Sequence, residues 1–294
     1  MIKKECFTAE WIEQVSSELH YNDKNLIEKV IRALSLLEML VKAGCPLVFK
    51  GGTALMLILG KSAHRLSIDI DLICPPGTNI EDYLKSFADF GFINLELVER
   101  KQRDDADIPK SHSKFFYQIA YRNDTDAQSY ILLDVLYEDI HYFRTQQIAI
   151  NCPFIRLEGK PLMVTVPSAE DILGDKLTAF APNTTGIPYY KNGRSCSMEI
   201  AKQLYDVGRL FENVSDLQIT KEAFRKIAVV ELSYRSFGTD IGQVFNDIRQ
   251  TALCISTRGK AGEGDFDLIQ DGIIRVKSFM YKQRYLIDHA IIDA

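Results

Sequence analysis

Two aspartates spaced two positions apart follow closely on a glycine pair. Residues 50–55 read KGGTAL and residues 65–72 read RLSIDIDL. On a β-strand alternate side chains point to one face, so Asp69 and Asp71 are predicted to project together while their apolar neighbours enter a core. Neighbouring carboxylates repel unless a cation lies between them. The spacing therefore predicts a divalent-metal site beside a phosphate; the alternative is an exposed strand edge with two solvated aspartates.

The glycine pair lies between a predicted strand and the start of a predicted helix. Gly51 and Gly52 would let a phosphate approach the backbone, where free N–H groups and the helix dipole favour an anion. The hydroxyl of Thr53 could add a hydrogen bond to a phosphate oxygen. A glycine pair alone more often makes a simple turn, so this prediction depends on the aspartates that follow.

A third carboxylate lies inside an apolar strand pattern. Asp134 is the charged residue within residues 130–137, YILLDVLY. A buried aspartate is costly without a cation or metal nearby. Two-metal phosphoryl transfer uses such a group to orient the attacking hydroxyl and share the second Mg²⁺. Asp134 is therefore predicted as a metal ligand and catalytic group, the alternative being an edge-strand aspartate that faces water.

Two further charged residues lie in helical patterns of the second half. Lys176, within residues 171–180, could reach a triphosphate as a point charge, although such a lysine alone is often a surface residue. Asp206 shares a predicted helix face with Lys202, four residues earlier. An intrahelical ion pair would explain that spacing equally well, so spacing leaves the role of Asp206 open.

The remaining pattern predicts the elements that position these groups. Helical periodicity covers residues 8–44, 53–59 and about 80–90. Strands are predicted at residues 46–49, 67–74, 92–100, 114–121, 129–137 and 162–166. Ser168 with Asp171 opens a helix, residues 182–195 form a long polar loop, and helices follow at about 197–212, 220–231, 239–255 and 266–282. We expect an α+β fold with a mixed or antiparallel sheet flanked by helices (residues 1–166) and then a C-terminal helical bundle (residues 167–294).

Composition limits the class of protein. The net charge of −5 lacks the basic excess typical of bulk nucleic-acid binding, and no DNA partner is expected. No apolar run reaches the roughly 18 residues of a membrane span, and the first residues contain no signal-peptide core. The six cysteines lack the CxxC spacing of zinc sites and are expected to be reduced. We expect a cytoplasmic protein without a membrane partner.

Two polar segments could contact RNA or could simply be solvated loops. One comprises Lys101, Arg103, Lys110, His112 and Lys114. The other lies in the long loop and contains Tyr189, Tyr190, Lys191 and Arg194. An exposed tyrosine there could stack on a base or anchor the loop.

Four segments in order resemble the AbiEii/AbiGii toxin family of the DNA polymerase β-like nucleotidyltransferase superfamily. They are residues 50–55, 65–72, 176–179 (KLTA) and 202–206 (KQLYD). The resemblance implies that Gly52 and Thr53 hold a triphosphate, that Lys176 contacts phosphates, and that Asp206 is needed for activity. It also implies that Asp69 and Asp71 bind Mg²⁺. Arg65 and Ser67 match the family's Arg-x-Ser, which would position the aspartates or contact the nucleotide, and Gln203 stands where family members often carry aspartate.

Residues and resemblance together predict a nucleotidyltransferase that uses Mg²⁺ or Mn²⁺ and a nucleoside triphosphate. The phosphates would lie on residues 51–53 and Lys176, and the acceptor hydroxyl would attack the α-phosphorus. By resemblance the protein is the toxin of a toxin–antitoxin or abortive-infection system with a cognate antitoxin, acting on RNA such as the 3′ end of a tRNA. The alternatives are a small-molecule acceptor of the antibiotic type, a protein acceptor, or an inactive nucleotide-binding regulator.

Overall fold

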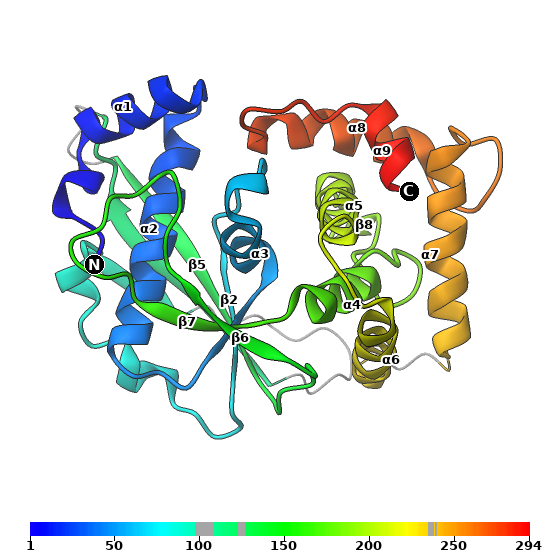
Figure 1. Ribbon diagram of the computed structural model, residues 1–294, viewed down its shortest axis with the longest axis horizontal. Helices are drawn as coiled ribbons and strands as arrows, with labels where there is room; N and C mark the ends of the chain where they lie inside the picture. Colours follow the sequence, from blue (N-terminus) through cyan, green and yellow to red (C-terminus); the bar gives the residue numbers. More distant parts are fainter. Residues whose placement is uncertain (98–108, 123–126, 235–237, 239) are drawn as a thin grey trace. The chain divides into compact units, whose positions relative to one another are not determined.

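The computed structural model describes residues 1–97, 109–122, 127–234, 238 and 240–294. These residues form two compact units. The first comprises described residues within 1–97, 109–140 and 145–167, and the second comprises residues 141–144 with those of 168–294. Figure 1 shows the chain coloured along its sequence.

The first unit is built on a mixed five-stranded sheet. Its strands are β1 (Val48–Lys50), β2 (Ile70–Cys74), β3 (Asn94–Leu97), β4 (Lys110–Gln118) and β5 (Gln128–Tyr137). They lie in the order β1-β2-β5-β4-β3. β2 and β5 run parallel, whereas β1–β2, β5–β4 and β4–β3 are antiparallel. The predicted combination of helices with a mixed sheet is confirmed.

Helices and a second small sheet surround these strands. The helices are α1 (Ala9–Leu19), α2 (Lys24–Lys42) and α3 (Gly51–Leu59), and the second sheet pairs β6 (Thr145–Ala149) with β7 (Met163–Pro167). α2 packs against β2 and β5, and β7 packs beside β1 (Figure 1). β6 has no counterpart in the sequence prediction, because its half-exposed polar pattern resembles a loop.

Two predicted helices of this unit differ from the structure. The pattern over residues 8–44 is two helices, because His20 takes a left-handed conformation (φ 51°) and the Asp23 side chain caps the next helix at Leu26 N–H. The predicted helix at 80–90 is two 3₁₀ turns, Ile80–Tyr83 and Phe87–Phe90. The glycine predicted to end it, Gly91, does have the left-handed conformation of a helix cap (φ 81°).

The second unit consists mainly of helices. They are α4 (Ala169–Ala179), α5 (Ser197–Phe211), α6 (Leu217–Ser233), α7 (Ile241–Ser256), α8 (Phe266–Val276) and α9 (Ile287–Asp293). Ser168 caps α4 as predicted, since its hydroxyl oxygen accepts the Asp171 N–H at 3.2 Å. α8 ends earlier than residue 282, and α9 is an additional helix that its short apolar pattern does not predict.

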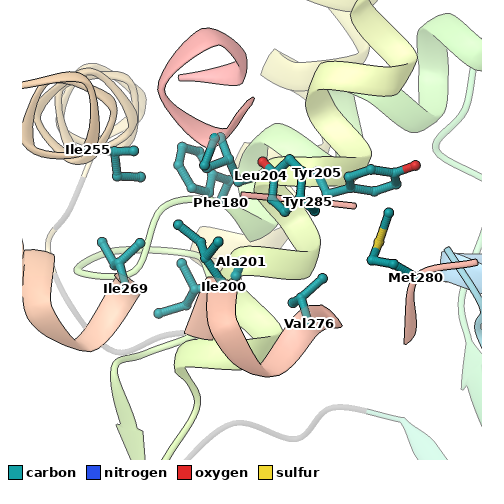
Figure 2. Packing of buried hydrophobic residues seen from close by; sticks show 12 residues of the cluster. Phe180, Ile200, Ala201, Leu204, Tyr205, Ile255, Ile269, Val276, Met280 and Tyr285 are labelled. Atoms are coloured by element: carbon teal, nitrogen blue, oxygen red, sulfur yellow. The ribbon is translucent and has the colours of Figure 1, made fainter. Parts of the chain in front are cut away.

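One apolar cluster organises the second unit around α5 (Figure 2). Ile200, Ala201 and Leu204 lie on the buried face of α5 at helical spacing. They pack with side chains from α7, α8 and the C-terminal segment, such as Ile255, Val276, Met280 and Tyr285. Burial of this face fixes the rotation of α5, so the opposite face, which carries Asp206, has a defined direction.

Two further observations concern the helices and the cysteines. Within the described residues, no helix is both long and apolar enough to cross a bilayer. All six cysteines are free.

Candidate active site

The glycine pair connects β1 directly to α3. Gly51 has a φ of +78°, a conformation that side-chain-bearing residues rarely adopt. A Cβ added to Gly51 would overlap the Asp71 carboxylate, and one added to Gly52 would lie 2.7 Å from Ser67 Oγ and 2.9 Å from Arg65 Nη2. Both glycines are therefore required by close packing against residues of the second predicted motif.

The aspartates lie at the start of β2 and are positioned differently from each other. The strand begins at Ile70, so Asp69 precedes it and is exposed, whereas Asp71 lies within the strand and is half-buried. The prediction that both aspartates lie on the strand is wrong for Asp69. Sheet pairing fixes Asp71, while Asp69 is held through its backbone.

Thr53 provides that backbone contact. Its side chain is fully buried, and its hydroxyl donates a hydrogen bond of 2.7 Å to the Asp69 carbonyl oxygen. A buried hydroxyl whose proton is donated there does not reach a phosphate oxygen, so the structure corrects the predicted role of the Thr53 side chain. Its contribution is to join the start of α3 to the segment that carries Asp69.

The sheet aligns four polar residues across four neighbouring strands. Asp71 on β2 lies opposite Lys50 on β1 and beside Asp134 on β5, and Asp134 lies opposite His112 on β4. Residues opposite each other in register point to the same face of a sheet. We call Lys50, Asp71, Asp134 and His112 the cross-sheet row.

The cross-sheet row lies on the less buried face of the sheet. On β5, Ile131, Leu133 and Val135 are buried, whereas Asp134 is half-buried and so are the residues two positions before and after it. Strand alternation thus places apolar side chains in the core and Asp134 where a ligand can reach it. The structure brings together Asp71 and Asp134, which the sequence predicted as partners.

His112 contacts Asp134 directly. Its Nδ1 lies 2.5 Å from Asp134 Oδ1, and only 12% of its side chain is exposed. The sequence placed His112 in a basic polar segment, of which Lys101 and Arg103 lie outside the described residues, and missed this contact. The available signal is its position in the alternating pattern of β4, but strand register is needed to bring it opposite Asp134.

The residues of this site fit a divalent cation. Among the residues that the structure describes, no group of three or more His, Cys, Asp and Glu side chains is arranged to hold a metal. Mg²⁺ in phosphoryl-transfer sites is commonly held by one or two carboxylates together with substrate phosphates. Asp71 and Asp134 supply two carboxylates from adjacent strands. Neighbouring strand backbones in a sheet lie about 4.8 Å apart.

The predicted pair in the second unit is buried and in contact. Lys176 on α4 forms an ion pair with Asp206 on α5 at 2.9 Å, with the two side chains 10% and 2% exposed. Lys176 Nζ also donates to Gln203 Oε1 at 3.0 Å. Lys202 instead has its ammonium 3.6 Å from the centre of the Phe279 ring. Lys176 is thus not a surface lysine, and two residues of the fourth predicted motif hold its charged end.

A network of hydrogen bonds fixes α4, which carries Lys176. The buried Asp171 carboxylate accepts the backbone N–H groups of Phe143 and Arg144 at 2.7 and 3.0 Å. One turn later, Asp175 accepts the hydroxyl of Tyr142 at 2.8 Å. These contacts hold α4 to the segment 141–144 and restrict the position of Lys176.

The long loop after α4 contains a small hairpin. β8 (Tyr190–Lys191) and β9 (Arg194–Ser195) are joined by Asn192 and Gly193, whose φ angles of 53° and 75° are those of a type I′ turn. Tyr189 packs against the apolar cluster and accepts the Cys196 N–H at 2.9 Å. The two tyrosines therefore differ. Tyr189 anchors the loop, whereas Tyr190 is 59% exposed and free to stack on a base.

One comparison with a solved structure agrees with the architecture. No curated protein sequence is significantly similar to the chain. Among solved structures, MenT4, a nucleotidyltransferase toxin from Mycobacterium tuberculosis H37Rv, is similar with a TM-score of 0.52 and 14% identity, over 79% of this chain and 76% of that chain. JHP933 from Helicobacter pylori matches at 17% identity over 70% of this chain and 92% of that chain, with a TM-score of 0.36.

A family assignment follows from the sequence profile described as "Nucleotidyl transferase AbiEii toxin, Type IV TA system". It matches residues 33–277, well over half of the chain. The matched range contains all four motifs, and such a toxin implies a nucleoside triphosphate substrate and a cognate antitoxin. The chain belongs to the AbiEii nucleotidyl transferase toxin family.

Proposed function

We propose that the protein transfers a nucleoside monophosphate from a nucleoside triphosphate to a hydroxyl of an RNA acceptor, with Mg²⁺ or Mn²⁺ held by Asp69, Asp71 and Asp134. The observation that carries the proposal is the parallel register of Asp71 with Asp134, next to the turn at Gly51. Two carboxylates on one face beside a glycine turn suit a metal-bound triphosphate.

The reaction follows from the residues of this site. The acceptor oxygen attacks the α-phosphorus and forms a new P–O bond, and the bond to the bridging oxygen of the β-phosphate breaks. Its electron pair leaves with pyrophosphate, and Asp134 takes the hydroxyl proton. The backbone N–H groups of Gly51 and Gly52, at the start of α3, donate to phosphate oxygens. When bound, the divalent cation neutralises charge on the phosphates and aligns them.

The second unit contributes a positive charge in this proposal. Lys176 contacts the phosphates, as the family resemblance implies, and Asp206 holds the lysine side chain in one orientation. The ion pair of 2.9 Å and the hydrogen bond from Lys176 to Gln203 support that division of roles. Arg65 and Ser67 support the turn at Gly52, against which their side chains pack.

Transfer assays with purified protein test the proposal. The protein is incubated with each α-³²P-labelled nucleoside triphosphate and total RNA, with and without EDTA. We expect transfer that EDTA abolishes and that added Mg²⁺ or Mn²⁺ restores. Asp69→Ala and Asp71→Ala should each abolish transfer, while Asp89→Ala, which removes an exposed aspartate of the same unit, should not. Full activity in either site variant would refute the mechanism.

The hairpin of residues 190–195 supports RNA as the acceptor. Lys191 and Arg194 lie directly opposite each other across the two strands, and all residues from 190 to 194 are exposed. Like charges facing each other destabilise a hairpin, and neither forms an ion pair with a described residue. A phosphate backbone would neutralise both, and Tyr190 offers a ring on which a base can stack. The 3′ end of a tRNA is the first acceptor to examine.

Salt dependence tests the hairpin. The double variant Lys191→Ser/Arg194→Ser should bind total tRNA more weakly, with the slope of log affinity against log salt reduced by about 0.7 for each lost phosphate contact. The matched control Lys221→Ser/Arg225→Ser removes two exposed cations from α6 and should leave the slope unchanged. Equal slopes for both double variants would exclude the hairpin as an RNA contact. In the transfer assay, preferential labelling of a protein or an aminoglycoside would show that the acceptor is not RNA.

A further inference from the structure

His112 lies at one end of the cross-sheet row and is not used in the proposed reaction. It lies on β4 directly opposite Asp134, and its Nδ1 is 2.5 Å from Asp134 Oδ1. Its side chain is 12% exposed and that of Asp134 is 33% exposed. A short contact from a nearly buried ring to a more open carboxylate is typical of a group that orients its partner.

The contact involves one of the two carboxylate oxygens. Among the residues that the structure describes, the Asp134 side chain makes one polar contact, from Oδ1 to His112 Nδ1, and Oδ2 has no hydrogen-bond partner. The neighbour of Asp134 on its other side is Asp71, whose negative charge would push the carboxylate away. A hydrogen bond to Oδ1 counters that repulsion and restricts rotation of the carboxylate group.

We infer that His112 is a positioning residue, which donates its Nδ1–H to Asp134 Oδ1 and so holds Oδ2 in the orientation that receives a divalent cation. This inference rests on the proposed function, because it assigns Asp134 to the metal site. Carboxylates that bind metals are in turn held by hydrogen bonds, and loss of such a partner typically lowers metal affinity or activity by about 10- to 100-fold.

Side-chain geometry provides variants that separate this role from simple packing. The amide nitrogen of asparagine is bonded to Cγ, as Nδ1 of histidine is, so His112→Asn keeps a donor at nearly the same place. His112→Gln moves the amide one carbon further out, and His112→Leu keeps volume without a donor. If His112 only filled space, His112→Leu would be the best tolerated of the three.

A matched control exists on the same two strands. Phe116 and Tyr130 are also opposite each other on β4 and β5, with ring centres 5.7 Å apart, on the same face as His112. Phe116→Leu removes a cross-strand contact of similar size without touching Asp134. It should lower thermal stability and leave metal binding and transfer unchanged.

The experiment measures two quantities for each purified full-length variant: affinity for Mn²⁺ added alone, by electron paramagnetic resonance, and kcat and KM for the triphosphate in the transfer assay. We expect the Mn²⁺ affinity and the kcat of His112→Leu and His112→Gln each to fall about 10- to 100-fold. The KM for the triphosphate should change little. His112→Asn should recover to within a few-fold of wild type.

The outcomes separate this inference from the proposed function. Wild-type Mn²⁺ affinity and kcat in His112→Leu would overturn the inference. It would also be overturned if His112→Asn were as defective as His112→Gln. That second comparison remains valid if the leucine variant does not fold. If Asp71→Ala retains Mn²⁺ binding and transfer, the proposed function itself fails. Inactive Asp71→Ala together with fully active His112→Leu would refute the inference alone.

Discussion

Replacement of Gly51 by alanine should damage the site in a way that the structure allows us to work out. Gly51 has a φ of +78° and its missing Cβ would overlap the Asp71 carboxylate. The left-handed backbone costs an alanine about 1–2 kcal/mol, and overpacking adds about 1–3 kcal/mol unless the carboxylate rotates away. Either outcome moves Asp71, and a displacement of about 1 Å at a reacting centre can lower the rate about 100-fold.

Gly44 provides a control with the same backbone conformation. Its φ is +76°, and no atom lies within 4 Å of an added Cβ. Gly44→Ala should therefore show the backbone cost alone, about 1–2 kcal/mol in urea unfolding, with transfer activity close to that of wild type. Gly51→Ala should be less stable than Gly44→Ala and should lose about 100-fold in transfer.

Metal binding distinguishes two causes of that loss. If the added methyl group displaces Asp71, Gly51→Ala should also bind Mn²⁺ more weakly in the absence of nucleotide. If it only blocks the triphosphate, Mn²⁺ affinity alone should be unchanged. Equal stability of the two alanine variants would mean that the Asp71 carboxylate rotates away from the added methyl group. Wild-type activity in a folded Gly51→Ala protein would refute the reasoning from the Cβ overlap.

Two further predictions concern buried polar groups of the second unit. Lys176→Met removes the cation from a nearly buried ion pair and should lower the free energy of unfolding in urea by about 3–5 kcal/mol. The double variant Lys176→Met/Asp206→Leu should regain most of that stability and still lack transfer activity. An equal loss of stability in both variants would contradict this prediction. Asp247 accepts hydrogen bonds from Asn183 N–H, Asn183 Nδ2 and Thr184 Oγ1 at 2.8–2.9 Å. Asp247→Ala should therefore lower the free energy of unfolding by about 1–3 kcal/mol for each donor left without an acceptor. It should also speed proteolysis within residues 182–195. Unchanged cleavage would show that these bonds do not hold the loop.

The candidate residues of the two units are stabilised by different physical means. In the first unit, sheet register places Asp71 beside Asp134, and close backbone packing at Gly51 and Gly52 leaves little freedom. In the second, a buried ion pair joins Lys176 to Asp206. Loss of one charge there is expected to affect stability and activity together, whereas loss of His112 is expected to affect activity more than stability.

Much of the sheet could be predicted because its strands alternate clearly or are uniformly apolar. The pattern of residues 129–137 predicts β5 to within one residue at its start, and Ser168 marks the beginning of α4 correctly. Other predictions failed where local signals were ambiguous. Residues 80–90 have helical spacing but form two 3₁₀ turns, and the continuous helical pattern of 8–44 conceals a break at His20. Periodicity reports which face is buried, and it does not report where one helix ends and the next begins.

The sequence by itself determined the class of enzyme and its candidate residues, because a glycine turn and closely spaced aspartates carry their chemical requirements in residue type and spacing. It identified Asp69, Asp71, Asp134, Lys176 and the glycine pair as candidate site residues, and the family assignment confirms the class of enzyme. Tertiary structure alone decided which of these groups meet. Strand register placed Asp134 beside Asp71, 63 residues earlier in the chain, and brought His112, 22 residues earlier, to the Asp134 carboxylate. No local pattern encodes that register, since each strand records only which of its faces is buried.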